Sequence, residues 1–511
     1  GSIIQTAGTA TGPAMNLSGV AIGSTGSPLS IDAATLTAQA DEDIYLAEEN
    51  DITLNNVTTN DGVIDVISGI TTGGEMNAVY VATGNDNNII LTANDDDITI
   101  TTVNAGNGDV VITANNGNIG NAGGTVTANN LTLTAAGNIQ LGTSANTLQA
   151  TGNGIIIISE ADALDLADIN VLGYSVLNSG NGITEIATGG DLTISDDIQS
   201  ASAEVVLNSG ANILQNADIY SGADVGIDAV GTFTMAPDTI INAGDSDIEI
   251  GDNNPIGGTV NLGLLRTTGD VEINTDADVV AAANTDVEIV ADELEINAGG
   301  SVGLGNQLDT DVRALTANVD NNDLVLYEAD GLLLNNVNTG TGDVTLVLEA
   351  GTLESIGTTR ITANDLIITG DGVININTNV DTLTASTNDA NITVNETSGL
   401  AVNTIDAGTG DVTLTLVAGA VTDGNGAGTN NVTANLLDIT APGGINLDTT
   451  INTLTADTSA SNGNIIIRES DGLALNLVDA GTGNVTLIAG GAITDNNGDD
   501  VNIISDTLNM I

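Results

Sequence analysis

The sequence predicts an all-β fold, a parallel β-helix (β-solenoid) with roughly 20–25 residues in each coil and about three coils in each superrepeat of ~70 residues. Three observations predict this fold. A glycine-rich stretch recurs along the chain, a second pattern of apolar residues recurs with identical offsets, and short strands alternate between apolar and polar residues. Such repeats are typical of folds in which each unit stacks on its neighbours.

The glycine-rich stretch is Ala-Gly-Thr-Gly-Asp-Val-Thr-Leu at 407–414. It returns with small changes at 339–346 and 480–487, and more loosely at 105–110. The three close copies start at residues 339, 407 and 480, so 68 and 73 residues separate them. A turn rich in glycine followed by a short β-branched strand suits the point where a coil changes direction, because glycine adopts positive φ at little cost.

Glycines beside an aspartate would also suit a ligand-binding loop. The aspartates of two copies are Asp343 and Asp411, but Asn484 replaces them in the third. A negative charge is therefore not required at this position. We expect these stretches to be coil corners in which the Asp or Asn side chain caps the turn.

The second pattern consists of five aliphatic residues and one glycine, and four copies share the same offsets. In three copies a Leu-x-Ala strand follows, whereas the fourth carries extra residues before Leu315. We expect such an insertion to form a loop on one face of a solenoid. The copies are Val126, Leu131, Leu133, Gly137, Ile139 and Leu141; Ile289, Leu294, Ile296, Gly300, Val302 and Leu304; Ile361, Leu366, Ile368, Gly372, Ile374 and Ile376; and Val432, Leu437, Ile439, Gly443, Ile445 and Leu447.

Strands of period two, such as those at 98–101, 131–134 and 192–194, are bounded by Gly, Asn or Asp, and signals for helices are nearly absent. An antiparallel sandwich can also show short strands at this spacing. It does not explain identical offsets every 70 or so residues, whereas stacking of equivalent positions in a parallel solenoid does.

Two regions are expected. Residues 1–30 are the least regular part and are interpreted as an irregular polar lead-in, a possible subunit-joining segment. Residues 31–511 are interpreted as a single continuous β-solenoid of imperfect superrepeats.

The composition is acidic and aliphatic. Among 511 residues there are 68 acidic residues and four basic ones, for a formal charge of −64, with no Cys, His or Trp. This charge disfavours nucleic acid and anionic lipid and attracts divalent cations. Without Cys there are no disulfides, and without a long apolar run no transmembrane helix is expected. The lack of His, Cys and Lys removes the usual catalytic bases and nucleophiles, so no enzyme is expected.

Acidic clusters near predicted turns are candidate calcium ligands, since hard cations prefer several oxygen ligands. The candidates are Asp95, Asp96, Asp97, Asp245 and Asp247. The alternative is that these are solvated acidic turns without a bound ion. No other cofactor is expected.

The stretch Val-Thr-Ala-Asn-Asn-Leu-Thr-Leu-Thr-Ala-Ala-Gly-Asn-Ile at 126–139, followed by Leu-x-Ala and by units of the Ala-Gly-Thr-Gly-Asp-Val-Thr-Leu type, resembles the repeats of filamentous-haemagglutinin-type bacterial adhesins. The resemblance covers 31–511 and is strongest over 310–511. It implies a large exported β-helical protein located outside the cell or at the cell surface of a prokaryote. It supplies no catalytic residues.

The chain remains strand-like through 501–511, without a polar cap. An exposed solenoid end can stack on another coil. The leading functional prediction is therefore an extracellular structural protein, a subunit of a surface fibre in which copies stack head-to-tail. The alternative is an adhesin stalk or ligand-binding segment of a giant exported surface protein, contacting cell-surface carbohydrate or other cells. Five Tyr and one Phe offer few stacking platforms for sugars.

Overall fold

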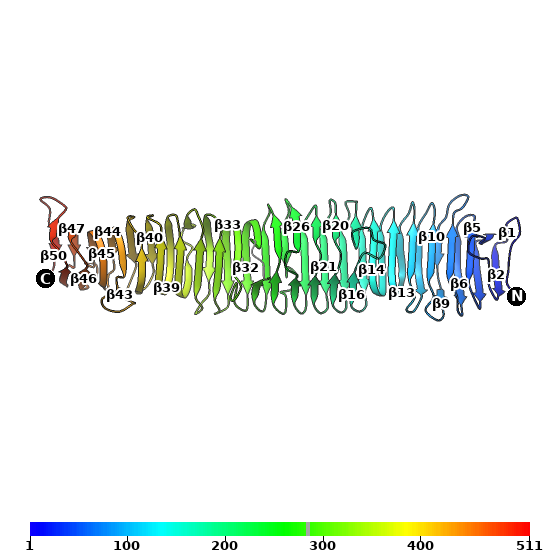
Figure 1. Ribbon diagram of the computed structural model, residues 1–511, viewed down its shortest axis with the longest axis horizontal. Helices are drawn as coiled ribbons and strands as arrows, with labels where there is room; N and C mark the ends of the chain where they lie inside the picture. Colours follow the sequence, from blue (N-terminus) through cyan, green and yellow to red (C-terminus); the bar gives the residue numbers. More distant parts are fainter. Residues whose placement is uncertain (283–286) are drawn as a thin grey trace. The chain divides into compact units, whose positions relative to one another are not determined.

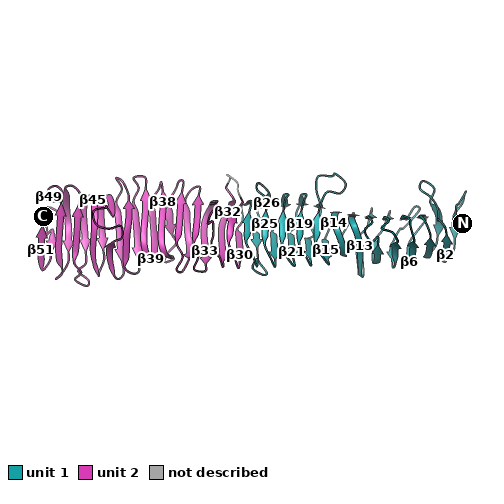
Figure 2. Ribbon diagram, turned by 60° about the horizontal axis from the view of Figure 1, so that its bottom comes forward, with its two compact units in different colours: residues 1–269 teal, residues 270–511 magenta. Residues whose placement is uncertain are grey.

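The computed structural model describes residues 1–282 and 287–511, which contain 51 β-strands and no helix (Figure 1). The strands form a parallel sheet wound into a β-solenoid of about 24 turns, which confirms the predicted fold class. In these residues, no helix has the length and hydropathy that crossing a membrane requires. The chain divides into two compact units, Gly1–Gly269 and Asp270–Ile511, which are coloured separately in Figure 2.

The first unit contains β1 to β29. These strands are β1 (Ala10–Thr11), β2 (Ala14–Gly19), β3 (Leu29–Asp32), β4 (Thr35–Ala40), β5 (Ile44–Glu48), β6 (Ile52–Thr59), β7 (Ile64–Ser68), β8 (Met76–Ala78), β9 (Val81–Thr83), β10 (Ile89–Ala93), β11 (Ile98–Asn104), β12 (Val110–Ala114), β13 (Ile119–Ala135), β14 (Ile139–Gly152), β15 (Ile156–Glu160), β16 (Leu164–Leu166), β17 (Val176–Asn178), β18 (Thr184–Thr188), β19 (Leu192–Ile194), β20 (Ile198–Ser200), β21 (Val205–Ser209), β22 (Ile213–Gln215), β23 (Ile219–Ser221), β24 (Val225–Ala229), β25 (Phe233–Met235), β26 (Ile240–Gly244), β27 (Ile248–Ile250), β28 (Val260–Leu262) and β29 (Leu264–Thr267).

The second unit contains β30 to β51. These strands are β30 (Val271–Thr275), β31 (Val279–Ala281), β32 (Ile289–Ala298), β33 (Leu308–Val319), β34 (Leu324–Glu328), β35 (Leu332–Asn338), β36 (Val344–Leu348), β37 (Leu353–Ser355), β38 (Ile361–Gly370), β39 (Ile374–Thr387), β40 (Ile392–Glu396), β41 (Leu400–Asp406), β42 (Val412–Leu416), β43 (Ala420–Asp423), β44 (Val432–Thr440), β45 (Gly444–Asp457), β46 (Ile465–Glu469), β47 (Leu473–Asp479), β48 (Asn484–Ala489), β49 (Ile493–Asp495), β50 (Ile503–Ile504) and β51 (Thr507–Met510).

Coils of the first unit contain three short strands each where the pattern is most regular. β18, β19 and β20 pair in parallel with β21, β22 and β23 of the next coil. Ile186 pairs with Leu207, 21 residues later, and Leu207 pairs with Ile227, 20 residues later. Because side chains of a strand alternate between its two faces, equivalent aliphatic residues lie over one another inside the coil.

In the second unit several strands continue through a corner. The first half of β39 pairs with β40 and its second half pairs with β41. β44 and β45 pair over their whole common length, from Val432 with Thr449 to Thr440 with Asp457. In these coils two strand segments therefore follow one another without a glycine turn between them. Such coils make up the predicted repeat.

The core consists of aliphatic ladders. The recurrent apolar positions are buried as predicted in the copies that begin at Val126, Ile361 and Val432. The only Phe of the chain, Phe233, is also buried, between Ile213 and Val260 of the adjacent coils.

Leu304 is the exception, because it is 53% exposed. Gly303 and Gly305 on either side of it have positive φ, so the chain leaves the coil after Val302. The extra residues predicted in this copy thus form a loop that carries Leu304 outward.

Residues 1–30 contain β1, β2 and the start of β3. β1 pairs with β3, and β2 pairs with β4 over six residues. An isolated bridge joins Ile3 to Ile22. This segment therefore belongs to the parallel pairing of the first unit.

Candidate functional site

The glycine-rich corners are built from a matched pair of residues in successive coils. Gly408 has φ of +57°, and Asp389 in the preceding coil has φ of +61°. The backbone N–H of Thr409 donates to Asp389 Oδ1 at 2.8 Å. A side chain at Gly408 would overlap the same carboxylate oxygen. Glycine is required here by both its φ and the close approach of the aspartate.

Three further corners repeat this arrangement, which we call the Asx–Gly joint. In each, an Asp or Asn with positive φ precedes a glycine with positive φ by one coil, and its side-chain oxygen accepts the N–H that follows the glycine. The joints are Asp86 with Gly106, Asn321 with Gly340, and Asn462 with Gly481. The recurring glycine-rich stretch is therefore a coil corner.

The aspartate of the same stretch caps the next corner. Asp343 Oδ1 accepts hydrogen bonds from Asn364 Nδ2 and from the N–H of Asp365. Asp411 Oδ1 accepts one from Asn435 Nδ2. An acceptor oxygen is all that this role needs, which agrees with the presence of Asn484 in the third copy.

Five buried glutamates form a second recurring device that the sequence interpretation missed. Each glutamate ends a strand, and its carboxylate accepts one N–H from the preceding coil and one from the residue two positions after itself. We call this arrangement the glutamate clamp. The five are Glu48, Glu160, Glu328, Glu396 and Glu469.

The residue that pairs with the glutamate in the preceding coil is threonine in four clamps. Thr143, Thr310 and Thr449 donate their hydroxyls to the carboxylates at 2.7–2.8 Å. The fourth threonine is Thr378, below Glu396. In the first clamp Ile31 pairs with Glu48 instead.

A sequence signal for the clamp exists. The glutamate follows two apolar residues at period two, so it occupies the third inward position of its strand, and an aliphatic residue follows four positions later. Leu324, Leu326, Glu328 and Leu332 show the pattern, and it recurs at the other four glutamates. The period of the strand alone would assign this position to the core, where a charged residue is not expected. The conflict between an inward position and a charged residue is the signal that identifies the clamp in the sequence.

Burial changes the proton affinity of these carboxylates. Desolvation raises the pKa of Glu48 to about 7 and that of Glu328 to about 7, against the opposing effect of the hydrogen bonds they accept. The pKa of Glu469 is raised for the same reason. A buried carboxylate binds its proton more tightly because the charged form loses its hydration.

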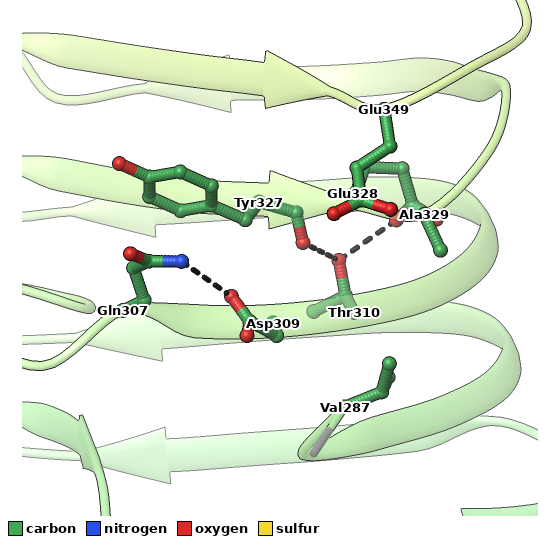
Figure 3. Close-up of a pocket in the computed structure, with 8 residues that line it drawn as sticks. All are labelled: Val287, Gln307, Asp309, Thr310, Tyr327, Glu328, Ala329 and Glu349. Carbon is green, nitrogen blue, oxygen red and sulfur yellow. Dashed lines mark hydrogen bonds between the residues drawn. The ribbon is translucent and has the colours of Figure 1, made fainter. Parts of the chain in front are cut away.

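One clamp is flanked by further carboxylates. Oxygens of Asp311, Glu328 and Asp330 lie within 4.8 Å of one another, with Glu328 buried and the two aspartates exposed. A cavity of about 140 Å³ adjoins Glu328 and is also lined by Asp309, Tyr327 and Glu349 (Figure 3). In Figure 3 Thr310 lies between the backbone carbonyl of Tyr327 and the carboxylate of Glu328.

This group has the donor set that a hard cation such as Ca²⁺ prefers, which is several carboxylate oxygens at one place. The corresponding positions beside Glu396 carry Asn379 and Ser398. Thr397 there donates its hydroxyl to Asn379 Oδ1 at 2.8 Å. The flanks of Glu328 are thus the more acidic of the two.

The aspartates predicted as calcium ligands lie elsewhere, at two separate corners of the first unit. Asp95 accepts from Asn116 Nδ2 and Asp97 from both the N–H and Nδ2 of Asn118, all in the following coil. Asp96 Oδ1 accepts the N–H of Asp97. Asp95 and Asp97 therefore fasten one coil to the next, whereas the hydrogen bond of Asp96 lies within its own corner.

The other two candidates, Asp245 and Asp247, lie between β26 and β27. Asp245 Oδ1 accepts the hydroxyl of Thr268 at 3.1 Å. Asp247 lies against Gly269 in the following coil. Within residues 1–282 and 287–511, the group of three carboxylates close enough to share an ion is the one at Glu328.

The fold and the repeated coil corners place this protein in the class of β-solenoid repeat proteins. Comparisons with protein-family models, with curated proteins and with solved structures give no match. The β-helical architecture is consistent with the resemblance to filamentous-haemagglutinin-type repeats, and membership of that family has no family match behind it.

Proposed function

We propose that the protein is an extracellular structural protein of a prokaryotic surface, without enzymatic activity, whose copies stack end to end into a fibre. One observation carries the proposal. Leu508 and Met510 in β51 are each 46% exposed, whereas their partners Val485 and Leu487 in β48 are buried. A further parallel coil over β51 would bury these inward side chains and pair the free strand edge.

The strand edge at β2 supports a second copy of the chain as the source of the coil over β51. Met15 and Leu17 in β2 are only half-buried, whereas their partners Leu36 and Ala38 in β4 are buried. The first charged side chain of the sequence is Asp32. Natural sheet edges are commonly protected by charged residues, and this edge has none.

The two edges belong to different surfaces, so their contact is heterologous. A heterologous contact that does not close into a ring produces an open filament. Acidic residues near β51, among them Asp499, Asp500 and Asp506, repel another acidic edge and favour the uncharged one at β2.

Negative-stain electron microscopy and sedimentation of the purified chain test the proposal. We expect wild-type protein to form concentration-dependent filaments. Met510→Lys, on the inward face, should abolish them, whereas Asn509→Lys, on the outward face of the same strand, should not. A wild-type chain that stays monomeric at every concentration would contradict the proposal.

The second candidate is a stalk segment of a larger exported adhesin, in which the coil over β51 comes from the same polypeptide. The parallel register between β48 and β51 could continue into a further coil of the same polypeptide, so it supports the stalk equally well. A monodisperse monomer that binds carbohydrate or cells would support this function. Tyr80 and Tyr220 are exposed but lie in different coils, so a stacked aromatic platform from these two is not formed.

A further inference from the structure

Seven asparagines of the chain are followed directly by glycine, and the structure divides these Asn–Gly dipeptides into two groups. In four of them the N–H of the glycine donates a hydrogen bond within its own corner. In the other three, among residues 1–282 and 287–511, the glycine N–H has no hydrogen-bond partner. The bonded glycines are Gly108, Gly426, Gly463 and Gly498, and the unbonded ones are Gly117, Gly154 and Gly182.

The hydrogen bond matters because the glycine nitrogen can attack the asparagine side chain before it, and asparagine is a chemically labile residue. A base in the solvent takes the proton of the glycine N–H, and the nitrogen forms a bond to the asparagine Cγ. The bond from Cγ to Nδ2 breaks, and Nδ2 leaves as ammonia. Water then opens the resulting five-membered ring at either carbonyl carbon and leaves aspartate or isoaspartate, so the net reaction consumes one water and releases one ammonia. A glycine whose N–H is bonded must first lose that bond, which slows the attack.

Two of the three unbonded dipeptides share one corner of the first unit. Asn153–Gly154 follows β14, and Asn181–Gly182 precedes β18 in the next coil. The strands on both sides pair in parallel, β14 with β17 and β15 with β18. A Cβ built on Gly182 would lie 2.7 Å from the backbone carbonyl carbon of Gly154. The two dipeptides therefore lie one over the other, and we call them the stacked dipeptides.

The asparagine side chains of the stacked dipeptides are exposed and loosely held. The Asn181 amide makes no hydrogen bond to the described residues, so its Cγ can turn toward the nitrogen of Gly182. The Asn153 Oδ1 accepts the hydroxyl of Ser179 at 3.3 Å, and the same hydroxyl lies 3.3 Å from the Gly152 carbonyl oxygen. The Asn153 Nδ2 has no hydrogen-bond partner in the described part of the chain. A donor at Oδ1 favours the attack, because negative charge develops on this oxygen when Cγ becomes tetrahedral.

The third unbonded dipeptide, Asn116–Gly117, provides an internal comparison. Gly117 is buried, and the Asn116 Nδ2 donates to the Asp95 carboxylate at 2.8 Å and to the Asn94 carbonyl oxygen at 3.2 Å. These hydrogen bonds fix the amide and hold the leaving nitrogen in place. We therefore expect Asn116 to react more slowly than the stacked dipeptides, although its glycine N–H is also unbonded.

We propose that Asn153 and Asn181 form a site of spontaneous deamidation, at which the folded chain converts two neutral side chains into aspartate or isoaspartate without an enzyme. The inference stands on this corner alone and does not depend on end-to-end stacking. Each conversion adds a negative charge, and two such charges in adjacent coils repel one another. Isoaspartate also adds a carbon to the main chain, so the corner no longer follows the path of its neighbours. The modification therefore loosens this corner as the protein ages.

Peptide mapping of the full chain by mass spectrometry after prolonged incubation tests the site. The protein is incubated folded and, in parallel, in denaturant, and is then digested in acid with pepsin, which avoids deamidation during digestion. In the folded chain we expect the peptides with Asn153 and Asn181 to deamidate at least roughly fivefold faster than those with Asn107 and Asn462. In denaturant the seven dipeptides should react at similar rates, since no glycine N–H is then bonded within its corner.

Variants separate the contributions of the side chains. Ser179→Ala removes the donor at the Asn153 Oδ1 and should slow the reaction of Asn153, while Asn181 keeps its rate. Asn153→Gln and Asn181→Gln should each abolish the modification at the changed position, because the longer side chain would have to close a larger ring. Asn107→Gln is the matched control in a dipeptide with a bonded glycine, and it should leave both rates unchanged.

Two results would overturn the inference. The first is a folded chain in which Asn153 and Asn181 react no faster than Asn107 and Asn462. The second is the same ratio of these rates in the folded chain and in denaturant, because the neighbouring sequence and not the corner would then determine the rates. An unchanged rate of Asn153 in Ser179→Ala would contradict the role assigned to the hydroxyl.

Discussion

Thr143 Oγ1 donates a hydrogen bond of 2.8 Å to Glu160 Oε2 in the following coil, and both side chains are buried. This pair connects two coils through side chains inside the solenoid, in addition to the backbone ladder. Removal of the hydroxyl leaves the buried carboxylate without this donor. The loss of water around the carboxylate is then no longer offset by the hydrogen bond.

Thr143→Val should therefore destabilise the protein. The substitution keeps the shape of the side chain and removes the hydroxyl, so we expect a loss of about 1–3 kcal/mol in the free energy of unfolding. Thr378→Val is the control, because Thr378 Oγ1 is buried without a hydrogen-bond partner. Chemical denaturation of both variants checks the difference, and equal losses would contradict the role assigned to the threonine.

Gly408→Ala should weaken an Asx–Gly joint. An alanine at φ of +57° is strained, and its Cβ would overlap Asp389. We expect a loss of at least about 1 kcal/mol. Gly226→Ala is a matched control in β24, where φ is ordinary and the nearest atom to a new Cβ is 3.9 Å away. A smaller effect at Gly408 than at Gly226 would exclude the joint as a stabilising device.

Arg468→Met should destabilise more than Arg313→Met. Arg468 Nη1 lies 3.0 Å from Asp448 Oδ1, and the side chain of Asp448 is only 5% exposed, whereas Arg313 pairs with two exposed carboxylates. Loss of the arginine leaves the buried Asp448 carboxylate without its positive partner. We expect the free energy of unfolding to fall by about 2–3 kcal/mol. The exposed pair should contribute less, because water and salt screen it. Thermal unfolding of the two variants measures the order.

Calcium should raise the thermal unfolding midpoint beyond the effect of magnesium at equal ionic strength, if the acidic corners bind it. The charge of −64 alone makes any added salt stabilising by screening, so the comparison with magnesium is the necessary control. Asp311→Asn tests the group at Glu328, and Asp97→Asn tests the corner predicted from the sequence. If Asp311→Asn and Asp97→Asn respond to calcium as the wild type does, neither corner is a calcium site.

The sequence was sufficient to predict the coils because the solenoid repeats the same local rule many times. Leu131 and Leu133 are apolar, occur at period two and recur at fixed offsets, and all of these signals indicate an inward strand position. Leu304 shares the offsets but is exposed, because two glycines with positive φ lead the chain away from the coil. The spacing of residues in the sequence does not specify the backbone conformation of an insertion.

The glutamate clamps and the acidic group at Glu328 were not predicted, since both depend on which residues of successive coils meet. Glu328 and Thr310 are 18 residues apart, Glu469 and Thr449 are 20 apart, and Glu160 and Thr143 are 17 apart. Coil length thus varies at the clamps, so no fixed sequence spacing identifies the pairs. The register of the sheet was needed to bring them together.

The Asx–Gly joints have a consequence for how such a chain can change in length during evolution. Each joint divides its two halves between successive coils, as Asp389 and Gly408 show. Deletion of a single coil removes one half of a joint, whereas duplication or deletion of a complete superrepeat, which contains both coils, leaves each Asp or Asn facing a glycine. Loss of half a coil would separate the halves and would turn outward threonines toward the core. Genetic insertions and deletions should therefore survive in steps of whole superrepeats, and shorter changes should be confined to loops.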